Sequence, residues 1–247
     1  MARQPAIELH GIGVEYRLEE DRILSFKEFA IRRLLRGVQS RVIRALNNVS
    51  LQVQHGEVFG LVGKNGAGKS TLMRVVSRVL HPTSGRLVTR GRVAPLLELG
   101  AGFHPDMSGQ ENVFLNALIL GYPRKEVAAR LDTIFSFAEL DDFRAAPVRT
   151  YSSGMQARLG FSVATMFRPD ILVLDEVWAV GDVGFREKCF RRIQEFRSQG
   201  TTILLATHDA TAISDYCDRA ALLDHGELVT IGDSNSVLAR YQELFSK

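Results

Sequence analysis

Short apolar runs alternate with amphipathic helical patterns along most of the chain. Residues 57–62, 171–174 and 202–206 are apolar at nearly every position, as strands buried on both faces are. Residues 69–80 and 185–198 have the spacing of helices. Buried strands separated by helices predict an α/β fold, with a mostly parallel core sheet covered by helices on both faces.

The middle of the chain breaks this alternation. Residues from about 104 to 165 predict a helical subdomain inserted between strands, with candidate helices at 111–120, 125–138 and 153–165. We expect this subdomain to belong to a single domain that spans residues 1–247.

The two ends of the chain have different patterns. Residues 7–16 and 49–53 predict an N-terminal antiparallel β part. Residues 220–224 and 227–231 predict a hairpin around His225-Gly226, and a last helix is expected from Ser234.

Composition excludes several classes of protein. The content is 45% hydrophobic and 24% charged, which is ordinary for a globular protein. The two cysteines, Cys189 and Cys217, are too few for a disulfide framework and fit a reducing cytoplasm, where such residues are buried small apolar groups. No apolar run approaches the ~18–20 residues that span a bilayer, and residues 1–10 lack the apolar core of a secretory signal.

Positive charge is concentrated in one block. The net charge is only +3, yet residues 22–44 hold seven basic residues and one acid. Because the net positive charge is confined to this block, it argues against a nucleic-acid-binding surface spread over the whole protein. Within it, one helical stripe is apolar (Ile31, Leu34, Leu35, Val38, Val42) and the opposite side is basic (Arg32, Arg33, Arg36, Arg44).

This pattern is typical of a helix at an anionic membrane surface, and we hypothesise that this basic insert lies there. A solvated basic face packed on its own core is the alternative. Gly37, in the middle of the pattern, also allows two shorter helices.

A phosphate-binding loop is predicted between the strand at 57–62 and the helix from Lys69. The motif G-x-x-x-x-G-K-[ST] is formed by Gly63, Lys64, Asn65, Gly66, Ala67, Gly68, Lys69 and Ser70, followed by Thr71. Glycines let backbone N–H groups wrap around phosphates at a helix N-terminus. Lys69 is expected to reach the β- and γ-phosphates, and the Ser70 hydroxyl to bind Mg²⁺.

Two carboxylates follow the apolar strand at 171–174. Asp175 is placed to hold Mg²⁺ through water beside Ser70, because both follow parallel strands. Glu176 is expected to face the γ-phosphate and to polarise the attacking water.

Between these motifs, Tyr151 is followed by Ser152, Ser153, Gly154 and Met155 at the start of a helix. Together the three motifs, in this order, resemble the nucleotide-binding domain of ATP-binding cassette (ABC) proteins, whose signature is usually L-S-G-G-Q. Ser153 and Met155 depart from the usual Gly and Gln. The resemblance implies ATP and Mg²⁺ as ligands, and a head-to-tail homodimer in which these residues bind the γ-phosphate held by the other subunit.

The resemblance also implies roles for four further residues. Tyr16 matches the aromatic that stacks on adenine, although a lone tyrosine at a strand end is equally often structural. His208 matches the switch histidine that contacts the γ-phosphate, and Asp182 the acid of the loop after the catalytic glutamate. Glu98 lies about one position from the glutamine that usually touches Mg²⁺ and faces the permease.

Three strings are similar to the ATPase subunits of exporters of O-antigen, capsule or teichoic acid: residues 151–155, 97–105 and 179–189. The resemblance thus implies an ATPase that drives export of a lipid-linked polysaccharide, works with two copies of a transmembrane permease, and binds peripherally at the cytoplasmic face of the cell membrane. Nucleic acid is not an expected partner. An exporter of a drug or lipid, or a soluble ABC protein acting on ribosomes or DNA, are the alternatives.

Overall fold

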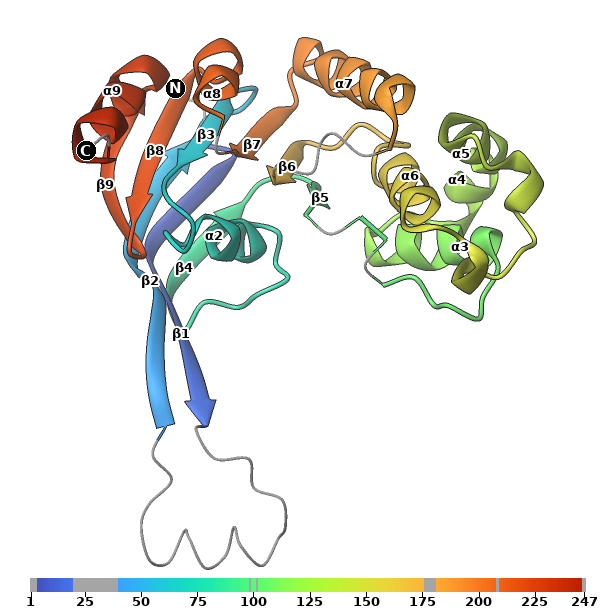
Figure 1. The fold of residues 1–247 in the computed structure, drawn as a ribbon, viewed down its shortest axis with the longest axis horizontal. Helices are drawn as coiled ribbons and strands as arrows, with labels where there is room; N and C mark the ends of the chain where they lie inside the picture. Colours follow the sequence, from blue (N-terminus) through green and yellow to red (C-terminus); the bar gives the residue numbers. More distant parts are fainter. Residues whose placement is uncertain are drawn as a thin grey trace, which may run out of the picture.

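The computed structural model describes residues 4–19, 40–97, 99–100, 102–175, 181–207 and 209–245. Two sheets and a group of helices make up this part of the chain (Figure 1). The larger sheet has the strand order β5-β6-β7-β3-β8-β9 and consists of β3 (Val58–Val62), β5 (Val93–Leu96), β6 (Ile171–Asp175), β7 (Thr202–Ala206), β8 (Arg219–Asp224) and β9 (Glu227–Asp233). All its neighbouring strands are parallel except β8 and β9.

Helices cover both faces of the larger sheet, as predicted. On one face, α2 (Lys69–Val76) packs with a second sheet in one apolar core. On the other face, α7 (Val183–Ser198), α8 (Ala210–Tyr216) and α9 (Ser234–Phe245) form a second core. Alternate residues of β6 and β7 belong to the two cores, which explains why these strands are apolar throughout.

The second sheet is antiparallel and joins β1 (Ile7–Glu19), β2 (Ser40–Val53) and β4 (Ser84–Thr89). The expected N-terminal β part is therefore present, but β1 and β2 are longer than predicted. Their far ends leave the body of the molecule as a two-stranded ribbon (Figure 1).

The end of the basic insert was predicted wrongly. Val42 and Arg44, expected on a helix, lie in β2 opposite Arg17 and Glu15, and Arg44 donates to Glu15 at 2.9 Å. Two adjacent β-branched residues, Val42 and Ile43, favour a strand when a partner strand is available. Residues 22–39 lie outside the described part, so the membrane-surface helix stays a hypothesis.

The inserted helices gather at one side of the molecule (Figure 1). They are α3 (Gly109–Ile119), α4 (Arg124–Ala128), α5 (Leu131–Ala138) and α6 (Ser153–Ala164), with short 3-10 turns η1 (Asp141–Phe143) and η2 (Val148–Thr150). The single helix expected at 125–138 is two helices, because Arg130 leaves the helical region with φ −115° and ψ 3°. The group has an apolar core of its own.

One further helix is shorter than the sequence predicted, whereas the C-terminal hairpin is present as expected. The helix expected at 69–80 ends at Val76, where Arg78 takes a φ of +59°. The hairpin turn is formed by His225 and Gly226, both at positive φ as a tight two-residue turn requires. Among the described residues, no helix has the length and apolarity needed to cross a membrane.

Candidate functional site

The phosphate loop lies between the end of β3 and the start of α2, and two of its glycines are required by close packing. A Cβ on Gly63 would lie 2.4 Å from the carbonyl oxygen of Leu223. Gly68 has a φ of +105°, and its Cβ would lie 2.8 Å from the carbonyl oxygen of Ala45. These glycines therefore let β2 and β8 approach the loop from both sides.

The start of α2 is suited to binding an anion. Its N-cap residue is Gly68, so no side chain caps the helix. The first N–H groups of a helix have no partner within the helix and carry positive potential. Ser70 is exposed at this end, whereas Lys69 is only 7% exposed.

Lys69 also organises the loop that surrounds it. Its Nζ donates to the carbonyl oxygens of Gly63 at 2.6 Å and Lys64 at 3.1 Å. The N–H of Ala67 donates to the Lys64 carbonyl as well, at 3.1 Å. The loop is therefore curved around the ammonium group, which brings a positive charge to the floor of the site.

A cavity of about 330 Å³ opens over the loop. Its wall contains the predicted loop residues from Lys64 to Thr71, together with Ala45 and Asp175. Asp175 reaches it because β6 and β3 flank β7 in parallel, with Asp175 and Leu61 both opposite Ala206. The carboxyl ends of these strands meet at one edge of the sheet, where ligands bind in α/β folds.

The cavity fits a hydrated Mg²⁺ bound with a nucleotide. Ser70 supplies a hydroxyl and Asp175 a carboxylate, the hard oxygen donors that Mg²⁺ prefers. Among the described residues that line the cavity, Asp175 is the one acid. Such a site leaves most of the coordination positions to water and phosphate oxygens, which is usual for this metal.

Three predicted site residues, Glu98, Glu176 and His208, lie outside the described residues. Their roles stay predictions from the sequence. Glu176 follows β6, which ends at Asp175, and His208 follows shortly after β7, which ends at Ala206. These two strands end at the same edge of the sheet.

Tyr16 lies on β1 near the cavity but is not among the residues that line it. Tyr16 pairs with Ile43 on β2. Ile43 is two positions before Ala45, which lines the cavity. Tyr16 is 37% exposed. This place suits a residue that stacks on the base of a nucleotide, and that role is untested.

The signature residues lie on a different part of the molecule from the phosphate loop. Ser152 caps α6, and its hydroxyl accepts a hydrogen bond from the Met155 N–H at 3.2 Å. Ser152 and Ser153 are exposed, and none of the signature residues lines the phosphate cavity. A Cβ on Gly154 would meet its nearest neighbour only at 3.8 Å. Within the part of the chain that the structure describes, no neighbour is close enough to require a glycine at position 154.

Asp182 is a helix cap rather than a wall of the phosphate cavity. Its carboxylate accepts the Phe185 N–H at 3.0 Å at the start of α7, and it pairs with Arg158 of α6. The N–H of Phe185, together with the Arg158 charge, lowers the pKa of Asp182. Asp182 thereby connects the signature helix to α7.

Ala45 is a site residue that the sequence did not reveal. It has no chemical signature, and its position depends on β2 crossing the phosphate loop. The turn after β8 contributes too, because the Gly226 N–H donates to the Ala67 carbonyl at 3.0 Å. These supports come from residues far from the motif in the sequence.

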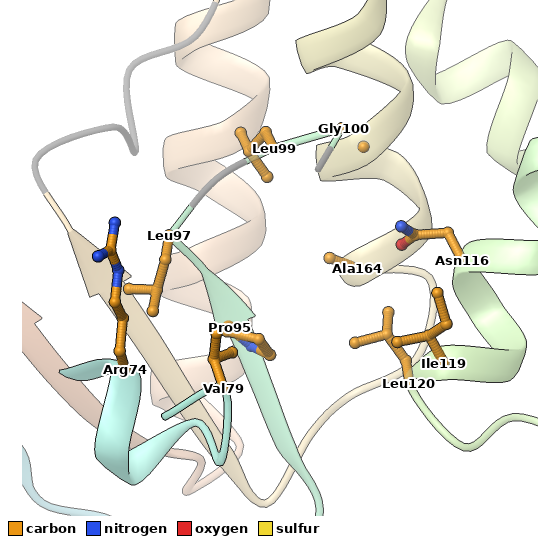
Figure 2. A pocket seen from close by; sticks show the side chains of 11 residues that line it. Arg74, Val79, Pro95, Leu97, Leu99, Gly100, Asn116, Ile119, Leu120 and Ala164 are labelled. Carbon is orange, nitrogen blue, oxygen red and sulfur yellow. The ribbon is translucent and has the colours of Figure 1, made fainter. Parts of the chain in front are cut away.

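A second, mostly apolar groove of about 180 Å³ lies between α2, β5 and the inserted helices (Figure 2). Figure 2 shows Pro95 of β5, with Leu97 just after that strand, on one side of it, and Ile119 at the end of α3, with Leu120 just after that helix, on the other. Val79 and Ile119, which line it, are each 67% exposed, which is unusual for large apolar side chains.

Comparisons with known proteins agree with this geometry. The family model described as "ABC transporter" matches residues 46–179. The chain is 42% identical to the O-antigen export system ATP-binding protein RfbB of Klebsiella pneumoniae, over 97% of this chain and 98% of that protein. It is 46% identical to the protein of that name from Myxococcus xanthus, over 90% of this chain but only 52% of that longer protein.

More distant proteins have similar folds or related names. The teichoic acids export ATP-binding protein TagH of Lactiplantibacillus plantarum is 36% identical over the whole of this chain and 67% of its own length. A dimeric ATP-binding cassette in a post-hydrolysis state, bound to ADP and phosphate, superposes with a TM-score of 0.69 at 22% identity, over 92% of this chain and 98% of that one. The predicted fold class is thus confirmed, and the chain belongs to the ABC transporter family of ATP-binding proteins.

Proposed function

We propose that this chain is the ATPase subunit of an exporter of polysaccharide, coupled to a separate membrane permease. The observation that carries the ATPase is the cavity in which Ser70, Lys69 and Asp175 meet over the phosphate loop. The names of the similar proteins, which concern export of O-antigen and teichoic acids, favour a polysaccharide over a drug or lipid. These names also favour polysaccharide export over an action on ribosomes or DNA.

The chemistry follows from the charges around the loop. Lys69 and the N–H groups at the start of α2 stabilise negative charge on the β- and γ-phosphates. Ser70 and Asp175 would hold Mg²⁺, which neutralises phosphate charge when bound. Glu176 polarises the attacking water, and His208 contacts the γ-phosphate. Tyr16 stacks on adenine.

The complete site needs a second copy of the chain. Ser152 and Ser153 are exposed at the start of α6, and none of the signature residues lines the phosphate cavity of its own chain. The unrestricted space at Gly154 supports a role outside the chain, where a phosphate approaches the backbone closely. In a head-to-tail homodimer, ATP binding closes two composite sites and hydrolysis reopens them.

The apolar groove of Figure 2 is the surface we assign to the permease. It lies between β5, which belongs to the core sheet, and α3 of the inserted helices, so a segment seated there senses both parts. Exposed Val79 and Ile119 offer apolar area that a membrane subunit's cytoplasmic segment would bury. Binding there places the subunit peripherally at the cytoplasmic face of the cell membrane, where a lipid-linked glycan is the substrate we expect.

Two substitutions test the ATPase assignment in the assembled transporter. Glu176→Gln should lower kcat by about 10²–10⁴, the usual contribution of a general base, while MgATP still binds. Lys69→Ala should instead weaken MgATP affinity by about tenfold or more, because a buried cation next to the phosphates is lost. Glu187→Gln, on the exposed face of α7, is the matched control.

Hydrolysis and nucleotide binding are measured on purified transporter, and polysaccharide export in cells. Both variants should lose export, and the control should retain it. Turnover of the Glu176→Gln protein within a few-fold of wild type would contradict the role of Glu176. Polysaccharide export that persists when hydrolysis is lost would contradict the proposed transport function.

A further inference from the structure

An aromatic side chain near the end of α9 lies against the phosphate loop. The Nζ of Lys64 lies over the ring of Phe245, 4.2 Å from its centroid. Lys64 occupies the second position of the loop and lines the phosphate cavity. α9 is therefore connected to the nucleotide site, although more than 160 residues separate the two in sequence.

Phe245 is held where it can support this contact. Its ring lies 5.1 Å from that of Tyr241, one helical turn earlier. Both rings are partly buried against the core that includes β3 and β8. The ring is thus a fixed platform, whereas an exposed lysine such as Lys64 otherwise samples many rotamers.

The backbone of Lys64 is the part of the residue that reaches the site. Its carbonyl accepts from Lys69 Nζ and from the Ala67 N–H, both at 3.1 Å. The residue whose side chain lies over Phe245 therefore also supplies the carbonyl that accepts from the Lys69 ammonium.

We propose that Phe245 is a positioning residue for nucleotide binding, which acts through Lys64 to keep the phosphate loop in its binding conformation. Its removal should weaken nucleotide affinity and leave kcat unchanged, because it touches no reacting atom. A cation–π contact at an exposed site contributes about 0.5–1 kcal/mol, which corresponds to a two- to fivefold change in affinity. This inference rests on the proposed nucleotide binding.

The test is a double-mutant cycle on the purified full chain, with MgADP as the probe because it is not hydrolysed. Phe245→Leu should raise the Kd for MgADP about two- to fivefold. Phe245→Tyr, which keeps the ring, should have the wild-type Kd. Leu244→Ala, at the exposed neighbouring position, is the control for damage to α9.

Lys64→Met removes the charge at nearly constant length. It should raise the Kd by a similar factor, and Phe245→Leu should add nothing to it. In ATPase assays, the KM for ATP should rise in Phe245→Leu with kcat within error of wild type.

Three results would overturn the inference: an unchanged Kd in Phe245→Leu, additive effects of the two substitutions, or an equal loss in Leu244→Ala or Phe245→Tyr. Failure of the wild-type chain itself to bind MgADP would instead contradict the proposed function. The two failures are therefore distinguishable.

Discussion

At the scale of single residues, motifs with local chemistry were predictable and their supports were not. The loop from Gly63 to Thr71 and the acid Asp175 follow from sequence, because phosphate binding needs particular residue types at fixed spacing. Ala45 and Phe245 gave no such signal. Each reaches the loop only because a distant strand or helix is packed there, and that depends on the tertiary structure.

The two cysteines permit a prediction about reactivity. Cys189 is fully buried and Cys217 is 6% exposed, and both are free thiols. Burial raises the pKa of each thiol to about 12. Because the thiolate is the reactive form, both should stay neutral and unreactive at pH 8.

Mass spectrometry after brief treatment with iodoacetamide checks this expectation. The native chain should carry no label on either cysteine, and the chain in denaturant should carry two. Rapid labelling of the native protein at Cys189, whose side chain is buried on the core-facing side of α7, would show that α7 opens readily.

At the scale of elements, the sequence pattern predicted the core strands and the C-terminal hairpin, but two edge strands were missed. β6 and β7 were found because they are apolar on both faces. β4 and β5 were missed: β4 is mostly exposed or half-buried, and β5 has only four residues, one of them Pro95. The extended part of β2 was mistaken for a helix, because alternation and helical spacing overlap in a short apolar segment.

Charged side chains between helices permit a second prediction, about stability. Arg158 of α6 pairs with Glu139 after α5 at 3.0 Å and with Asp182 at the start of α7, and lies over the Phe185 ring. Its replacement by Met should cost about 1–2 kcal/mol, and thus lower Tm by roughly 2–8 °C. Arg191→Met, on the exposed face of α7, is the control.

The effect of Arg158→Met should depend on pH. The pKa of Glu139 is lowered by Lys188 and Arg158, and that of Asp182 by its capping N–H and Arg158. A lowered carboxylate pKa contributes stability above the unfolded pKa of about 4, which is lost as pH falls through the folded value. Calorimetry should therefore find the full difference in Tm at pH 7 and a smaller one below pH ~4; a constant difference would contradict the ion-pair explanation.

At the scale of the whole molecule, the sequence indicated all three ATP-binding motifs, and the family resemblance implied that they belong to two chains. One structural observation is consistent with a site shared by two chains: the signature residues at the start of α6 do not line the phosphate cavity of their own chain. Figure 1 shows α6 among the inserted helices and α2 under the core sheet. Substitutions in the signature residues can test this pairing in the assembled protein.

Gly154 provides the sharpest substitution for this purpose. The space around it admits a side chain within the chain, and an aspartate in the first turn suits a helix N-terminus. Gly154→Asp should therefore keep the wild-type Tm and MgADP affinity. If the phosphate of a partner binds there, its negative charge should abolish hydrolysis. Gln110→Asp, at the same helical position of α3, should leave hydrolysis intact.

Heterodimers carrying two different affinity tags then locate the defect. With Lys69→Ala on one chain and Gly154→Asp on the other, both defects fall in one composite site and the second site is intact, so about half of the wild-type rate should remain. With both substitutions on the same chain and none on the other, each composite site carries one defect, and hydrolysis should vanish. Equal rates in the two arrangements would contradict the head-to-tail dimer, because the order of the substitutions matters only when each site takes its phosphate loop from one chain and its signature residues from the other.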